Sequence, residues 1–89
     1  MQFEYDQYKS KINQEKHGIS LEEARRMWFI SAVEVDAQSR FDEQRHMLIG
    51  KLSGKLYSVI FTMRGETIRL ISARRSSKRE VKIYHETIV

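Results

Sequence analysis

Apolar residues in the first third of the chain recur at helical spacing after a short alternating segment. Residues 3–5 predict an opening strand with both aromatic side chains on one side. Asp6 can cap a helix that we expect to end at Gly18, because glycine readily adopts the left-handed conformation that follows many helices. Ser20 and Glu23 have the spacing of a capping box, which predicts a second helix directly after the first.

In the middle of the chain the apolar period changes from about 3.6 residues to two, which indicates strands. Residues 32–35 predict a short strand, and residues 37–42 predict a polar loop. Longer strands are expected at residues 45–52 and 56–63. The Ser53–Gly54 step between them is typical of a hairpin turn.

One more strand and one helix complete the predicted elements. After a turn at residues 64–66, alternation indicates a strand that runs from residue 68 into a group of basic residues. Regular alternation places Arg69 on the opposite face of this strand from Arg74. A capping box then predicts a helix over residues 78–86.

These elements predict a single α+β domain over residues 1–89. It should contain a short N-terminal strand, two helices, a mainly antiparallel sheet of three or four strands, and a C-terminal helix. Gly50 falls inside a predicted strand, where glycine indicates a β-bulge or a close approach of another part of the chain. On the last helix, three residues should face the sheet: Val81, Tyr84 and Ile88.

Composition narrows the function classes. A hydrophobic content of 40% and a charged content of 31% are typical of a soluble globular domain. No apolar run approaches the roughly 20 residues that span a bilayer, so we expect no membrane partner. With no cysteine there is no disulfide or thiolate chemistry, which suits the cytoplasm. The three histidines lack metal-ligand spacing, which argues against a zinc site.

The net charge of +4 is concentrated near the C-terminus. Residues 1–63 carry nine Lys/Arg and nine Asp/Glu, whereas residues 64–89 carry seven and three. Clustered cations of this kind favour a polyanionic partner such as nucleic acid.

Several sequence blocks, spread over nearly the whole chain, carry a resemblance to a known family. They are Lys16–Gly18, Leu21–Ala24, Glu43 with Arg45, Ile49–Gly50, Thr62 with Arg64, Arg69–Arg74, and Glu80 with Tyr84. In these blocks the chain resembles the BrnT toxins of bacterial type II toxin–antitoxin systems, which are small ribonucleases with a RelE-like fold. It departs from the family at Ile30–Val33, where members often carry an Asp-Pro step.

The resemblance implies an endoribonuclease that cuts RNA without a metal or another cofactor and so halts translation. It also implies neutralisation by a BrnA-like antitoxin with a ribbon-helix-helix domain, in a toxin–antitoxin complex that can be of higher order. Contact with DNA would then be indirect, through the antitoxin.

Metal-free RNA cleavage needs a base for the 2′-hydroxyl proton, cations for the charged phosphorane, and an acid for the leaving 5′-oxygen. We expect Arg64 and Arg74 to hold the scissile phosphate, because a guanidinium donates two parallel hydrogen bonds to phosphate oxygens. His17 is the first candidate for proton transfer, since histidine titrates near neutral pH. It could equally stabilise the end of its helix. Tyr84 could pack in the core, stack on a base or donate a proton.

Two glutamates could have either a catalytic or a structural role. Glu43 could act in catalysis or pair with Arg45, and Glu80 could be a general base or only part of its capping box. The expected RNA-binding residues are Arg45, Arg69, Arg75, Lys78 and Arg79. The alternative function is a non-catalytic basic module that binds nucleic acid or an acidic protein segment.

Overall fold

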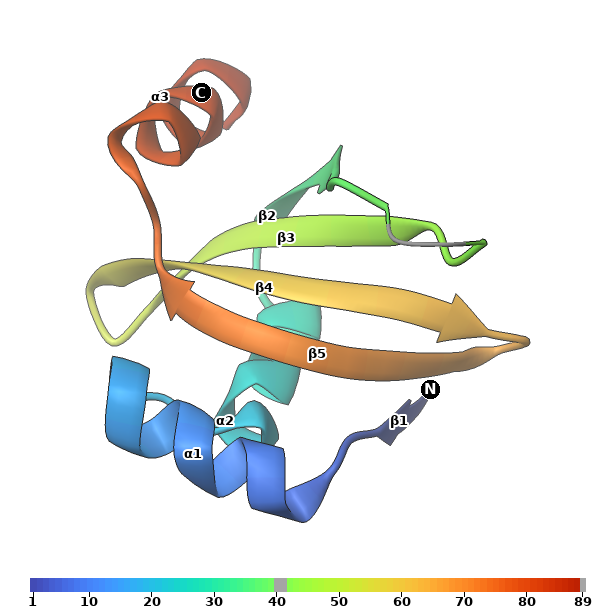
Figure 1. The fold of residues 1–89 in the computed structure, drawn as a ribbon. Coiled ribbons are helices and arrows are strands. Elements are labelled where there is room, and N and C mark those ends of the chain that lie inside the picture. The colour runs from blue at the N-terminus through green and yellow to red at the C-terminus, as the bar shows by residue number, and fades with distance from the viewer. Residues whose placement is uncertain (40–41, 89) are drawn as a thin grey trace.

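A five-stranded sheet forms the middle of the fold and carries helices on both of its faces (Figure 1). The chain is described by a computed structural model, which covers residues 1–39 and 42–88. The strands lie side by side in the order β1-β5-β4-β3-β2. Their bounds are Gln2–Glu4 for β1, Ala32–Asp36 for β2, Arg45–Leu52 for β3, Lys55–Arg64 for β4 and Thr67–Arg75 for β5.

The predicted α+β class is confirmed, with a sheet larger than the three or four strands expected. Both short segments, β1 and β2, join the sheet at its opposite edges. β1 pairs with β5 in parallel, and the other neighbours are antiparallel, so the sheet is mixed. The loop predicted at residues 37–42 falls partly outside the described residues, because residues 40 and 41 are not described.

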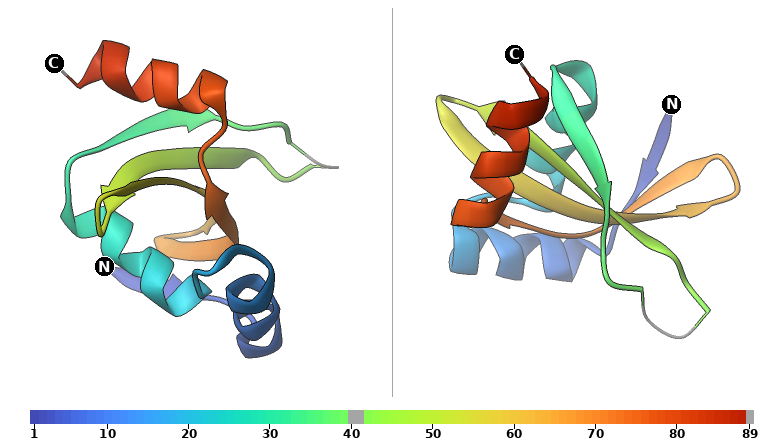
Figure 2. Two further views of the ribbon diagram at one scale, coloured as in Figure 1. Left: turned by 90° about the vertical axis from the view of Figure 1, so that its left-hand side faces the viewer. Right: turned by 90° about the horizontal axis from the view of Figure 1, so that it is seen from above.

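The helices divide between the two faces of the sheet (Figure 2). Helix α1 (Gln7–His17), helix α2 (Leu21–Ala24) and the 3-10 helix η1 (Arg25–Phe29) lie on one face, which we call the core face. Helix α3 (Lys78–Thr87) lies on the other, which we call the α3 face. The second predicted helix is thus one turn of α-helix that continues as a tighter 3-10 helix.

The main hydrophobic core lies between the sheet and the helices of the core face. Leu21, Ala24 and Met27 are completely buried there and pack on alternate residues of β4, Val59 and Phe61. The ring of Trp28 meets those of Phe3 and Phe61 edge-on, with centroid distances of 5.4 and 5.0 Å. Residues of α3 are half-buried or exposed, including the three expected to face the sheet.

The predicted helix boundaries are confirmed by their caps. The Asp6 carboxylate accepts hydrogen bonds from two N–H groups at the start of α1. Ser20 and Ser77 each form a complete capping box with the glutamate three residues later. Gly18 closes α1 with a φ of 74°, a left-handed conformation that glycine adopts without strain.

Gly50 marks a close approach of two chain segments, which was one of the two predicted readings. A Cβ atom at this position would collide with the sulfur of Met27, and would lie 3.2 Å from Cβ of Ala32. Glycine at this position therefore lets η1 pack directly on β3.

The β-bulge of the sheet lies in β5 and overturns a prediction. Ser72 pairs with Ile60 of β4, yet Leu70 pairs with the next residue, Phe61, so Ile71 is an extra residue on β5. The extra residue reverses the alternation between the two halves of the strand. The prediction that side chains alternate regularly along this strand was therefore wrong.

As a result, Arg69 and Arg74 lie on the same face. Arg69 is paired with Thr62 and Arg74 with Ser58, and these two partners are four residues apart on β4. Residues an even number apart on a regular strand share a face. Both arginines consequently project from the α3 face.

Candidate functional site

The α3 face presents its side chains in rows that run across the strands, because directly paired residues of neighbouring strands share a face. Arg45 of β3, Thr62 of β4 and Arg69 of β5 form one such row, with Glu4 of β1 at its end. We call Arg45, Thr62 and Arg69 the basic row. The sheet register thereby aligns two arginines from segments 24 residues apart in sequence.

Two carboxylates near the basic row, those of Glu4 and Glu43, offset part of the positive charge of its arginines and of the nearby Arg64. Arg69 Nη1 donates a hydrogen bond of 2.6 Å to Glu4 Oε2, and Arg64 Nη1 lies 3.8 Å from the same oxygen. Arg45 Nε lies 3.5 Å from Glu43 Oε1 without the geometry of a hydrogen bond. Among the described residues this buried Nε has no hydrogen-bond partner. All three arginines line one hollow of about 160 Å³, and its other charged residues are Asp6, Lys9 and Glu43. Four cations and two carboxylates in the lining leave a local excess of positive charge, even when Glu4 is included.

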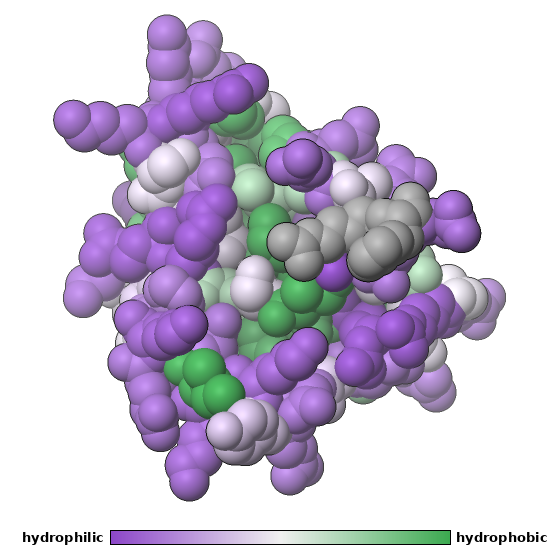
Figure 3. Space-filling view, viewed as in Figure 1, coloured by the Kyte–Doolittle hydropathy of each residue, from purple (hydrophilic) through white to green (hydrophobic). Residues whose placement is uncertain are grey.

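The next row toward α3, which we call the apolar row, is apolar at three of its four positions. Val35, Met47, Ile60 and Ser72 are paired in sequence across β2, β3, β4 and β5. They form the floor of a larger hollow with a cavity volume of about 610 Å³. Its walls come from the end of β2 and the residues after it, from the first residue of β3, and from α3. The wall residues are Asp36, Ala37, Gln38, Arg45, Arg79, Glu80 and Ile83. Figure 3, in the view of Figure 1, shows apolar atoms in the middle of the visible surface with hydrophilic side chains around them.

The third row carries the attachment of α3. Arg74 donates two parallel hydrogen bonds to Glu80, of 2.7 Å to Oε1 and 2.9 Å to Oε2. Ser58 Oγ donates another of 2.8 Å to Glu80 Oε1, and the Ser77 backbone N–H donates one of 2.9 Å. The Arg74 guanidinium above all, together with the Ser77 and Ser58 donors, lowers the pKa of Glu80 to about 2. A carboxylate held this way stays ionised and is a poor general base, so the structural reading of Glu80 is the better one.

This ion pair predicts a loss of stability in acid. The pKa of Glu80 is lower in the folded chain, about 2 against 4.5, so its contribution is complete above pH 4.5 and is lost as the pH falls toward 2. We expect the free energy of unfolding to fall by at most about 3 kcal/mol over this range, and by less because Arg74 is partly exposed to solvent.

Denaturant titrations at several pH values measure this effect. Glu80→Gln should be less stable at neutral pH and should show a shallower decline in acid than the unmodified chain. A matched variant, Glu86→Gln on the exposed side of α3, should keep the full decline. Equal slopes for the chain and Glu80→Gln would contradict the assignment.

The structure does not support the prediction that Arg64 and Arg74 hold one phosphate together. Arg64 pairs with Thr67 and Arg74 with Ser58, six residues apart on β4, which corresponds to about 20 Å along a strand. Each guanidinium is also turned toward a different carboxylate, Glu4 or Glu80. The arginine that lies beside Arg64 is Arg69, which regular alternation had placed on the wrong face.

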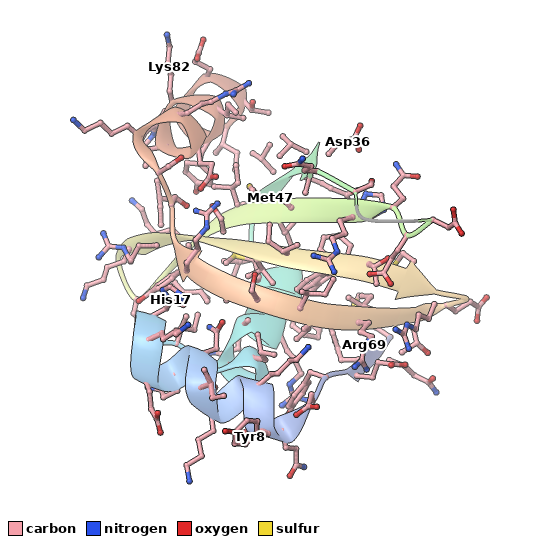
Figure 4. All side chains as sticks on the ribbon, viewed as in Figure 1. Tyr8, His17, Asp36, Met47, Arg69 and Lys82 are labelled. Atoms are coloured by element: carbon pink, nitrogen blue, oxygen red, sulfur yellow. The ribbon has the colours of Figure 1, made fainter. Side chains whose placement is uncertain are left out.

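His17 is placed apart from these arginines. It is the last residue of α1, on the core face (Figure 4), whereas the sheet register places the basic row on the other face, which also carries α3. Arg75 also belongs to the core face, where its guanidinium lies 5.8 Å from the ring centroid of Tyr57. The structure thus does not bring either residue to the arginines of the α3 face.

The predicted site residues on α3 fall into two groups. Arg79 lines the larger hollow, whereas Lys78 is exposed at the start of the helix. Tyr84 is half-buried, and its ring meets that of His85 edge-on. Sequence reasoning missed Met47, Ile60 and Ser72 of the sheet, and Ile83 of α3, as site residues. The three sheet residues were on predicted strands, but the residues opposite them across the sheet could not be read from local alternation.

Two negative observations concern the described residues only. Within residues 1–39 and 42–88, no group of three or more His, Cys, Asp or Glu side chains is arranged to hold a metal ion. None of the helices in the same part of the chain has the length and apolar character needed to cross a membrane.

Comparison with known proteins gives one match. A family model described as "Ribonuclease toxin, BrnT, of type II toxin-antitoxin system" matches residues 5–80. The matched range includes all three rows of the α3 face and Glu80, but it ends before Tyr84. The comparisons with curated proteins and with solved structures gave no match.

Proposed function

Because the chain belongs to the BrnT family of ribonuclease toxins of type II toxin–antitoxin systems, we propose that it cleaves RNA on its α3 face without a metal ion. The observation that carries this proposal is the basic row, in which Arg45 and Arg69 flank Thr62 and share a hollow with Arg64. Guanidinium groups that converge from separate strands suit a phosphate with oxygens on several sides.

In the proposed reaction the 2′-oxygen attacks the neighbouring phosphorus, and the 5′-oxygen of the next nucleotide leaves. The products are a 2′,3′-cyclic phosphate and a free 5′-hydroxyl. Arg45 and Arg69 stabilise the extra negative charge of the phosphorane, because fixed cations in a partly buried site need little reorganisation. Arg64, at the rim of the same hollow, adds a further contact to the phosphate.

Glu43 is the best-placed proton acceptor in this proposal. It lines the hollow with the three arginines, and Arg45 Nε lies 3.5 Å from its carboxylate without a formed hydrogen bond. Glu4, in contrast, is engaged by the short hydrogen bond from Arg69. Glu43 takes the 2′-hydroxyl proton, and the leaving 5′-oxygen takes a proton from solvent.

Arg74 and Arg79 contact a second phosphate of the same RNA strand. Arg74 uses Nη1 and one N–H of Nη2 for Glu80 and the Arg75 carbonyl, which leaves its Nε–H and the other Nη2–H for a ligand. Arg79 lies across the larger hollow from the basic row. The arginines of the α3 face therefore contact two phosphates of one RNA strand: Arg45, Arg64 and Arg69 contact the first, and Arg74 and Arg79 contact the second.

Cleavage in the presence of EDTA tests the proposal. Purified protein should cut RNA at the same rate with and without the chelator, and the fragments should end in a 2′,3′-cyclic phosphate. Glu43→Gln should cut at least tenfold more slowly, as expected for loss of a general base. Lys82→Ala, a cation that points away from the sheet (Figure 4), should cut normally. Salt-sensitive binding without any cleavage would favour the non-catalytic alternative.

We also propose that a BrnA-like antitoxin neutralises the chain by covering the α3 face. A type II system implies a protein antitoxin, and this face combines the arginines with the exposed apolar floor of the larger hollow. A purified antitoxin should stop cleavage at equimolar ratio. Undiminished cleavage in the mixture would contradict this part of the proposal.

A further inference from the structure

We infer that the larger hollow binds a single unpaired nucleobase next to the scissile phosphate, so that the substrate at this site is single-stranded RNA. This inference rests on the proposed function and names the part of the substrate that the hollow takes. It is carried by three features of the hollow: an apolar floor with an opposite wall, a polar rim, and its position relative to the basic row.

The floor and the opposite wall suit a flat aromatic ring. Met47 and Ile60 lie side by side on the sheet, and Ile83 of α3 lines the hollow with them. A base between them would have apolar side chains against both faces. The thioether of Met47 makes favourable contacts with aromatic rings. A cavity of about 610 Å³ is within the range of sites that bury small organic ligands.

The rim supplies groups that can bind the edge of a base. Ser72 closes the floor on the β5 side with a hydroxyl, which can both donate and accept a hydrogen bond. Asp36 and Gln38 lie on the β2 side, and Arg79 lies on α3. Bases present both donors and acceptors on their edges, so a mixed rim can distinguish one base from another.

The position of the hollow places a base beside its own phosphate. Arg45 lines both the larger hollow and the small hollow of the three arginines. The apolar row and the basic row are two residues apart on β3 and β4, which is about 7 Å along a strand. A nucleotide with its phosphate on the basic row can therefore reach the apolar floor with its base.

A base in a duplex does not meet these requirements. Its two faces are covered by neighbouring bases and its edge is paired, whereas the hollow lies between α3 and the sheet and needs a base turned out of the stack. Substrate selection by the hollow therefore acts on unpaired segments of RNA.

Scanning an RNA with single abasic residues tests this inference. The probe is a fluorescein-labelled decanucleotide made uncleavable by a 2′-deoxy substitution at the cut site, and the readout is its dissociation constant. Removal of one base, at one position only, should weaken binding roughly tenfold, as expected for the loss of one base–side-chain stack. Met47→Ala should weaken binding of the intact probe by a similar factor and should abolish the extra effect of the abasic residue.

Met63→Ala is the matched control, because Met63 lies on β4 at an exposed position of the core face. It should bind the intact and the abasic probes as the unmodified chain does. Ser72→Ala provides a second variant for the case in which Met47→Ala does not fold, and it should change base preference among the cleavage products. An abasic effect of the same size in Met47→Ala as in the unmodified chain, or an unchanged base preference in Ser72→Ala, would overturn the inference.

The outcomes separate this inference from the proposed function. Absence of cleavage with every RNA contradicts the ribonuclease proposal, and the binding measurements still decide whether a base enters the hollow. Normal cleavage with equal effects of abasic residues at all positions contradicts the base site alone. If Met47→Ala escapes inhibition by the antitoxin and keeps the abasic effect, the hollow belongs to a protein partner and the inference fails.

Discussion

Arg69→Ala should lower the rate of RNA cleavage by about 100-fold or more, the usual effect of removing one donor from a site that stabilises a charged transition state. Arg69 projects from β5 on the α3 face, next to the edge strand β1, and its hydrogen bond of 2.6 Å to Glu4 shows that its guanidinium is placed to contact an anion. Single-turnover cleavage of a labelled RNA measures the effect. Arg69→Lys should recover only a small part of the rate, because lysine cannot form two parallel hydrogen bonds.

Arg26→Ala is the control for the loss of one positive charge, because Arg26 is exposed on η1 at the other side of the sheet. It should retain nearly full activity. Arg45→Ala should resemble Arg69→Ala, and the double variant should lose less than the product of the two single effects, since both side chains act on one phosphate. A similar rate for Arg69→Ala and Arg26→Ala would remove the basic row from the mechanism.

Asn13→Ala should lower the free energy of unfolding by about 3 kcal/mol, because it leaves several buried backbone groups without partners. The buried Asn13 side chain donates to the carbonyl oxygens of Ile19 and Ala73, at 2.8 and 2.7 Å. It also accepts a hydrogen bond of 3.2 Å from the Ala73 N–H. One amide thus joins α1, the segment after it and β5.

Denaturant unfolding measures this loss, and Gln14→Ala, at the neighbouring exposed position of α1, is its control. Gln14→Ala should change stability by less than about 0.5 kcal/mol. Because Ala73 lies between Ser72 and Arg74, Asn13→Ala should also make cleavage more sensitive to temperature. Equal stability of the two variants would show that the hydrogen bonds of Asn13 are replaced by other contacts.

Local patterns were sufficient to predict most of the fold. Helix caps depend on residues three positions apart, and hairpin turns depend on adjacent residues, so the capping boxes and the Ser53–Gly54 turn could be recognised directly. The short edge strands were harder to count. β1 is three residues long, and its place in the sheet depends on parallel pairing with a segment more than 60 residues away.

The sequence indicated which kinds of residue form the candidate site, but it did not indicate how they are arranged. Most cations of the α3 face were recognised because Lys and Arg are concentrated in residues 64–89. Which of them lie close together depends on the residues that pair across the strands. The bulge at Ile71 decides the face of Arg69, and nothing in the local sequence distinguishes it from regular alternation. His17 has suitable chemistry, but the packing of α1 on the core face separates it from the arginines.

The extra residue in β5 makes the pairing of this strand as important as its composition. If Ile71 were deleted, Ser72 would follow Leu70 directly, and β4 and β5 would pair uniformly with the other residues of β5 on their present faces. If Ile71 stayed but paired regularly, the half of β5 after it would turn over, so that Arg74 would enter the interior and Ala73 would leave it. The way in which the sheet accommodates this one residue therefore decides which side chains of β5 reach the interior.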